Sequence, residues 1–151
     1  MSAVDDFEEV LEQCQRAVGE FVKGNPDLIK QLFSHSADVT LANPLGPAAS
    51  GIGPVARGWD EVAETQEHAA SQVREGESVG FEIVARHVSA ELAYVVWVEQ
   101  LKAKVGARED ITPFAQRATM IFRPEEGEWK VVHRHADPIT TAQPAESVIQ
   151  E

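Results

Sequence analysis

The segment WKVVHRHADP, residues 129–138, carries the side chains with the clearest capacity for chemistry. His133, His135 and Asp137 occupy every second position of a pattern typical of a β-strand, so they would project from one face. Two imidazoles and a carboxylate suit a Zn or Fe ion, and an imidazole can also transfer protons near neutral pH. A structural role at a subunit interface is the third alternative. The spacing alone leaves all three open.

The acidic composition argues against several classes of function. The chain has 151 residues and a net charge of −12, from 25 acidic and 13 basic residues. Such a surface repels phosphate backbones and anionic lipids, so we expect neither a nucleic-acid nor a membrane partner. No glycine pattern fits a nucleotide-binding loop, and we expect no cofactor. A single cysteine, no basic leader and no long apolar run predict a cytoplasmic protein.

The first half of the chain shows helical patterns. Apolar residues at helical spacing predict helices over residues 4–23, 26–33 and 59–73. The apolar stripe of the third helix includes Gln66. A short strand is expected at residues 37–43, and a long loop rich in Pro and Gly follows over residues 43–58. Loops of this length are often functional.

The second half of the chain is strand-like. Apolar and β-branched residues predict four strands, over residues 78–88, 93–105, 114–123 and 129–137. Short connections make them an antiparallel meander, and helices followed by strands indicate an α+β domain. We therefore expect a single domain over residues 1–138 and a frayed tail over residues 139–151.

Four segments together carry a resemblance to a known family: KGNPDLIKQLFS, ADVTLANPLG, GPVARGWDEV and RATMIFRPEEGEWKVVHRHADP. From residue 4 to 138 the chain resembles the SnoaL-like, ketosteroid-isomerase-like branch of the nuclear transport factor 2-like superfamily. The resemblance implies a cone-shaped half-barrel, in which a curved, mostly antiparallel sheet is covered by about three N-terminal helices. It also implies a pocket for a small, largely apolar molecule and a homodimer that pairs through the outer face of the sheet.

The isomerase chemistry of these relatives does not carry over residue by residue. The steroid isomerases use an aspartate before a Pro-x-Gly turn as the base, where this chain has Asn43, and an amide cannot take that role. Their oxyanion hole uses a tyrosine and a protonated aspartate, and the matching positions here are Ala17 and, approximately, Ala118. We therefore do not expect the ketosteroid isomerase reaction.

Relatives with a similar W-x-x-V-H-x-H ending, such as the calcium/calmodulin-dependent protein kinase II association domain, imply which residues face the pocket. Transferring their alternation places one set of side chains inside: Val132, Arg134, Ala136, Gln116, Ala118, Met120, Tyr94, Val96 and Val98. The opposite set faces a neighbouring subunit as a dimer interface: Trp97, Glu99, Arg117, Thr119, His133 and His135. Under this assignment the two histidines bind no metal.

Four polar or aromatic residues are candidates for the pocket in their own right. Arg134 in a half-apolar cavity needs a protein acid or an anionic ligand such as a carboxylate, unless it extends to the cavity mouth. Asn43 can hydrogen-bond a ligand or simply form the turn before Pro44. Trp59 is either a ligand platform or a packing anchor, and Tyr94 either donates its hydroxyl or packs in the sheet.

Two classes of function remain at this point. The first is a pocket protein for a small, largely apolar molecule, with or without a carboxylate group, that carries out isomerase, cyclase or dehydratase chemistry without a metal. Its polar pocket residues would be Asn43, Tyr94, Gln116 and Arg134. The second is a non-catalytic ligand-binding or homo-oligomeric assembly module.

Overall fold

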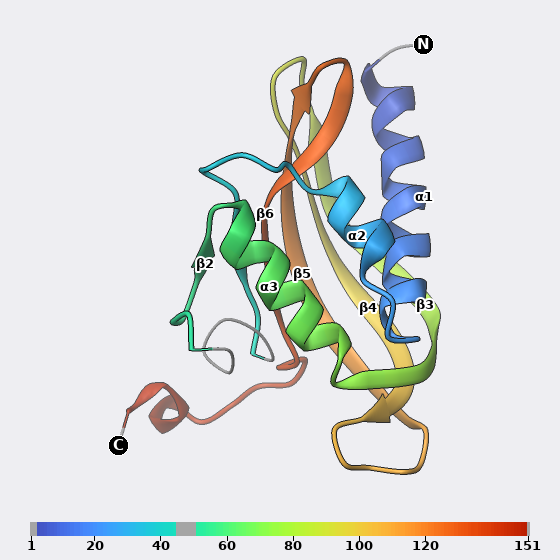
Figure 1. Cartoon of the computed structure of the whole chain (residues 1–151), viewed down its shortest axis with the longest axis vertical. Helices are drawn as coiled ribbons and strands as arrows, with labels where there is room; N and C mark the ends of the chain where they lie inside the picture. The colour runs from blue at the N-terminus through green and yellow to red at the C-terminus, as the bar shows by residue number, and fades with distance from the viewer. Residues whose placement is uncertain (1–2, 45–50, 151) are drawn as a thin grey trace.

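The computed structural model describes residues 3–44 and 51–150, and its elements are arranged as a curved sheet with helices on one side (Figure 1). The helices are α1 (Ala3–Phe21), α2 (Asp27–Leu32) and α3 (Trp59–Ala70). The strands are β1 (Thr40–Ala42), β2 (Ala56–Arg57), β3 (Val73–Val88), β4 (Ala93–Val105), β5 (Thr112–Glu125) and β6 (Glu128–Asp137). A short 3-10 helix, η1 (Ala145–Val148), lies near the C-terminus.

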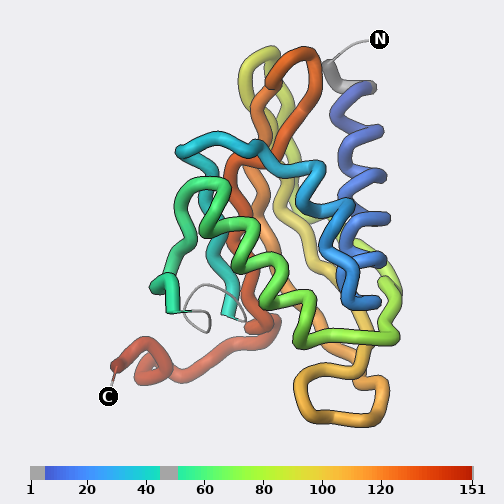
Figure 2. The backbone as a smooth tube through the Cα atoms, in the orientation of Figure 1, coloured from blue at the N-terminus to red at the C-terminus, as the bar shows by residue number. Residues whose placement is uncertain are grey.

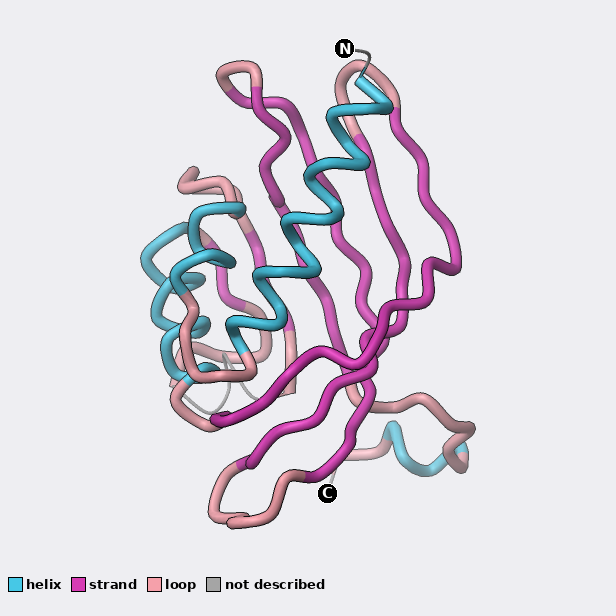
Figure 3. Tube along the Cα trace, turned by 90° about the vertical axis from the view of Figure 1, so that its right-hand side faces the viewer, coloured by secondary structure: helices cyan, strands magenta, loops and turns pink. Residues whose placement is uncertain are grey.

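The six strands form one sheet in the order β2-β1-β6-β5-β4-β3. Neighbours are antiparallel except β1 and β6, which run parallel. The sheet bends strongly and does not close on itself, and α1 lies across its concave side (Figure 3). The expected cone-shaped α+β half-barrel is therefore confirmed. Residues 139–150 leave the body of the protein beyond β6 (Figure 2), and the expected fraying of this tail stays a prediction.

The core lies between α1 and the concave face of the sheet. Phe7, Leu11 and Cys14 follow one another at helical spacing and are all buried, since this stripe of α1 faces the strands. The ring of Phe7 meets the edges of Phe122 from β5 and Trp129 from β6 at centroid distances of 5.0 and 5.7 Å. This packing fixes α1 over the middle of the sheet.

Two regions differ from the sequence expectation. Helix α3 ends at Ala70, three residues before the end of the expected helix, and strand β3 begins at Val73, five residues before the expected strand. Three irregularities in the β3–β4 pairing bend this strand and hide its alternation of polar and apolar residues. Strand β2 lies within the Pro- and Gly-rich segment that we expected to be irregular, where Leu41 of β1 pairs with Ala56.

A β-bulge at Val132 changes the alternation along β6. Val131 pairs with Phe122, but His133 pairs with the adjacent Ile121, so Val132 is an extra residue. As a consequence Val131 is buried in the core although it has the same parity as His133, which lies on the outer face. Strict alternation, which would put Val131 on the same face as His133, therefore does not hold across the bulge.

Strand β4 presents the opposite face to the one expected. Trp97 and Glu99 were expected on the outer face at the dimer interface, but both are fully buried. Their direct partners on β5 are Ala118 and Gln116, and directly paired residues share a face of the sheet. Tyr94, expected inside, therefore lies on the outer face. The expectation was wrong because both faces of β4 are rich in apolar residues, so the pattern alone did not distinguish them.

Candidate functional site

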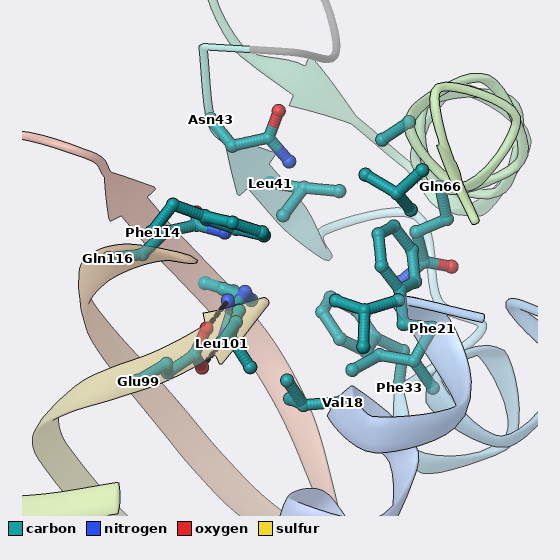
Figure 4. Close-up of a pocket in the computed structure, with 15 residues that line it drawn as sticks. Val18, Phe21, Phe33, Leu41, Asn43, Gln66, Glu99, Leu101, Phe114 and Gln116 are labelled. Atoms are coloured by element: carbon teal, nitrogen blue, oxygen red, sulfur yellow. Dashed lines mark hydrogen bonds and ion pairs between the residues drawn. The ribbon is translucent and has the colours of Figure 1, made fainter. Parts of the chain in front are cut away.

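A cavity lies between the concave face of the sheet and the three helices (Figure 4). The cavity is narrow, with a volume of about 60 Å³. Most of the wall is apolar and comes from α1, α2 and the strands, including Val18, Phe21, Phe33, Leu41, Leu101 and Phe114. Five polar side chains also line it: Asn43, Gln66, Glu99, Gln116 and Arg134.

A buried ion pair forms one side of this cavity. Arg134 of β6 reaches toward Glu99 of β4, and its Nη1 and Nη2 donate to Oε2 and Oε1 at 2.8 and 2.9 Å. The side chains are only 11% and 1% exposed. Trp97 donates its indole N–H to the same Oε2 at 2.9 Å, and Met120 Sδ lies 3.7 Å from Nη1. These contacts hold the carboxylate in one orientation.

Electrostatics keep the guanidinium charged. Burial, the strongest single influence, lowers the pKa of Arg134, but the charge and hydrogen bonds of Glu99 together raise it above its ordinary value. Burial raises the pKa of the Cys14 thiol to about 12. The charge of Arg134 lowers this pKa and the charge of Glu99 raises it, both with smaller effect. The thiol is therefore neutral at physiological pH.

The partner of Arg134 is a protein acid. Of the alternatives expected from sequence, the guanidinium is neither extended to solvent nor left for an anion, because Glu99 engages it in a two-bond pair. Among the described residues that line the cavity, these two are the only charged side chains. The charges cancel, so the lining presents no net positive charge to a ligand.

Amide side chains supply the other polar groups of the cavity. Gln66 of α3 is 3% exposed, and neither its amide nitrogen nor its amide oxygen has a hydrogen-bond partner among the described residues. Gln116 of β5 is half-buried and lies beside Glu99, its direct partner on β4. Asn43 follows β1 and turns its amide toward the cavity (Figure 4).

Three residues expected in the pocket are placed elsewhere. Met120 points to the concave side but is buried in the core behind Arg134 and is not part of the lining. Trp59 is half-buried and stacks on His35 at a centroid distance of 3.7 Å, outside the lining. Tyr94 is 36% exposed and stacks on His87 on the outer face. Of the residues expected in the pocket, Asn43, Gln116 and Arg134 are the three that line the cavity.

The two histidines of the opening segment lie on the outer face of β6. His133 Nδ1 is 2.7 Å from Thr40 Oγ1, while His135 is exposed, and the two rings are 6.5 Å apart. Burial and the charge of His135 lower the pKa of His133. Asp137 accepts a 2.8 Å hydrogen bond from Arg117. Within residues 3–44 and 51–150, no group of three His, Cys, Asp or Glu side chains is arranged to hold a metal ion.

Sequence reasoning did not assign Glu99 and Gln66 to the cavity. A signal for Gln66 was present, because it is a polar residue on the apolar stripe of a helix, where burial is expected. Glu99 gave a weaker signal. It alternates with Trp97 and Leu101, but Val96 and Val98 make the opposite face of the strand equally apolar.

Comparison with known proteins gives a family and a fold. Residues 29–140 match the model of the SnoaL-like domain, which is more than half of the chain. A nuclear transport factor 2-like superfamily protein from Salmonella enterica superposes with a TM-score of 0.71 at 18% identity, over 94% of each chain. No curated protein matches.

Two further solved structures share the fold. A ketosteroid isomerase-like protein from Erwinia carotovora gives a TM-score of 0.69 at 19% identity, over 91% of this chain and 96% of the other. A proposed dehydratase of the nuclear transport factor 2-like family from Streptomyces avermitilis gives 0.69 at 16% identity, over 92% and 98%. At these identities the likeness concerns the fold. No helix in the described part of the chain is long and apolar enough to cross a membrane.

Proposed function

We propose, on the premise that the chain belongs to the SnoaL-like domain family, that its cavity binds a small, largely apolar, uncharged molecule. The observation that supports this is the Glu99–Arg134 pair, whose charges cancel, in a wall that is mostly apolar. Apolar side chains take the body of the ligand, and the ion pair takes one hydrogen-bonding group. A carboxylate ligand, which the sequence left open, is less favoured because Arg134 is already neutralised.

The ion pair retains hydrogen-bonding capacity for a ligand. A carboxylate offers about four lone-pair sites, and Glu99 uses one on Oε1 and two on Oε2. Among the described residues, Nη2 of Arg134 makes one of its two possible hydrogen bonds. One N–H of Arg134 Nη2 and one lone pair of Glu99 Oε1 therefore remain available side by side. A hydroxyl or carbonyl group at the end of an apolar ligand fits this arrangement.

A second candidate is proton-transfer chemistry of the isomerase, cyclase or dehydratase type. Glu99 favours it, because it is the only acid among the described lining residues and a carboxylate can act as a general base. The proposed dehydratase of the same fold is in keeping with this candidate. Asn43 and Gln116 would then orient the substrate rather than transfer protons.

We also propose a homodimer through the outer face of the sheet, in the cytoplasm. Apolar side chains remain accessible on this face in the single chain, among them Tyr94 at 36% exposure and the half-buried Val96 and Val98. Arg117, Thr119, His133 and His135 lie on the same face and stay candidates for the interface. Trp97 and Glu99 are no longer candidates.

Charge selectivity tests the binding proposal. Acetophenone and benzamide are neutral probes, and benzoate is the anionic one. We expect calorimetric titration to show that the wild-type protein binds the neutral probes at least about tenfold tighter than benzoate, since burying a second carboxylate beside Glu99 is costly. The Glu99→Gln variant should reverse this preference, because Arg134 then lacks its counter-charge.

Asp137→Asn is the matched control. This variant removes the counter-charge of Arg117, as Glu99→Gln removes that of Arg134, but it does so on the outer face. It should leave the preference for neutral probes over benzoate unchanged. If benzoate binds the wild-type protein as tightly as the neutral probes, the uncharged-ligand proposal is wrong. If none of the probes binds at millimolar concentration, the cavity-binding proposal fails.

A further inference from the structure

Gln66 is the polar group of the cavity that the proposed function does not use. It projects from the middle of α3, and Figure 4 shows it across the cavity from Glu99 and Gln116. Its side chain is one of those that line the space, and the residue is 3% exposed. The apolar side chains of Phe21 and Phe33 lie on the same side of the cavity (Figure 4).

Both ends of this amide lack a partner. Neither Nε2 nor Oε1 makes a hydrogen bond with another group in the described part of the chain. A buried polar group without hydrogen bonds destabilises the folded protein, and most such groups in native proteins are paired. A leucine at this position of the stripe would avoid the cost. The carboxamide is therefore placed for a partner that enters the cavity.

The chemistry of that partner follows from the carboxamide itself. One face of the group offers an N–H donor and a carbonyl acceptor next to each other. The complementary group carries an acceptor and a donor at the same spacing, as in a primary amide or a lactam. A carboxylate has no donor, and a ketone or hydrocarbon leaves at least one atom of Gln66 unpaired.

We infer that Gln66 is a second polar anchor of the cavity, and that it selects neutral ligands bearing a primary amide or lactam group. The inference rests on the proposed function, since it names the class of uncharged molecule that the cavity takes. The amide end of the ligand pairs with Gln66, the apolar body packs against the phenylalanine side chains, and the far end faces Glu99 and Arg134.

A pair of isosteric probes tests the inference. Benzamide and acetophenone differ by an amino group in place of a methyl group, so only benzamide matches both atoms of Gln66. We expect the wild-type protein to bind benzamide about tenfold tighter than acetophenone, the effect of one additional hydrogen bond. In the Gln66→Met variant this ratio should fall to about one, with little change in the affinity for acetophenone.

Thr65→Val serves as the matched control. The Thr65 hydroxyl is also buried and without a partner among the described residues, but it does not line the cavity. This variant should retain the wild-type ratio. The comparison of two probes on the wild-type protein needs no variant, so the inference stays testable if Gln66→Met fails to fold.

The outcomes separate the two proposals. Equal binding of benzamide and acetophenone by the wild-type protein overturns the inference and leaves the proposed function standing. A benzamide preference that survives in Gln66→Met also overturns it, because the amide is then recognised elsewhere. Failure of the wild-type protein to bind either probe overturns both. Loss of the preference in Gln66→Met alone supports the inference.

Discussion

The Glu99–Arg134 pair places two charges inside an apolar cavity, where the removal of one leaves the other uncompensated. We expect Arg134→Met to lower the free energy of unfolding by about 3–5 kcal/mol, as is typical of a broken buried pair. In the double variant Glu99→Gln with Arg134→Met, the free energy of unfolding should fall by less than in Arg134→Met alone, since no isolated charge remains. Urea denaturation of the three proteins measures the difference.

The exposed pair Arg117–Asp137 is the matched comparison for this prediction. Its side chains are 56% and 30% exposed, so solvent screens the charges. Arg117→Met should therefore cost only about 0–1 kcal/mol. Equal losses for Arg117→Met and Arg134→Met would contradict the view that burial of the cavity pair determines its energetic role.

The thiol of Cys14 makes stability depend on pH in the alkaline range. Folding raises its pKa from 9.0 to about 12, mainly through burial, so the unfolded chain ionises first as the pH rises. The stability that this thiol contributes is complete below about pH 9 and declines as the pH approaches 12. We expect a smaller decline in urea midpoint between pH 8 and pH 10.5 for Cys14→Ala than for the wild-type protein. Parallel declines would show that the thiol does not cause the effect.

Two glycines of β3 differ sharply in their surroundings. A Cβ at Gly76 would lie 2.6 Å from the carbonyl oxygen of Lys102 and 2.7 Å from that of Val22, so both backbones would have to shift. A Cβ at Gly80 would meet nothing within 4 Å. We expect Gly76→Ala to destabilise the protein by about 1–3 kcal/mol.

Gly80→Ala is the control within the same strand. It should be neutral or stabilise the protein by up to about 1 kcal/mol, because alanine restricts the unfolded chain. Thermal unfolding followed by circular dichroism measures both variants. A similar melting temperature for the two would contradict the close approach of β3 to β4 and to the end of α1.

At the level of elements, much of the fold follows from the sequence. The bounds of β4 agree with the expected strand at residues 93–105, because an apolar run at its start passes into an alternation of apolar and polar residues that continues to Val105. The sequence pattern did not show which side chains of β4 and β6 point to the concave side of the sheet. The bulge at Val132 and the two apolar faces of β4 depend on pairing with β5, which is a tertiary property.

The candidate site was predictable only in part for the same reason. Arg134 and Gln116 were assigned to the cavity from the alternation of relatives, and Asn43 from its place before Pro44; the structure places all three in the lining. Glu99 was placed on the wrong face along with the rest of β4. With Glu99 outside, Arg134 had no visible partner, and a carboxylate ligand was one of the remaining explanations.

The whole molecule leaves a surface of mixed apolar and polar side chains on the convex side of its sheet, which we propose pairs with a second copy. Val96 lies on this face, directly opposite Thr119. We expect Val96→Glu to convert the dimer to a monomer, since pairing through this face would bury an unpaired carboxylate from each copy. Light scattering coupled to size-exclusion chromatography measures the mass against the 16.5 kDa of one chain.

The control makes the same change away from the sheet. Ile149 is 61% exposed and lies after η1, so Ile149→Glu should leave the mass unchanged. A wild-type protein that elutes as a monomer, or a Val96→Glu variant that stays dimeric, would rule out pairing through this face.

The extra residue in β6 separates two functions of one strand. Upstream of Val132, the strand packs its aromatic and aliphatic side chains against α1, while downstream it turns Arg134 to the cavity and the imidazoles outward. Protein engineers can therefore change the residues after Val132, which supply Arg134 to the cavity, without altering the residues before it, which pack against α1. Deleting Val132 would reverse the facing of one half of the strand. Either Trp129 would then leave the core or Arg134 would leave the cavity.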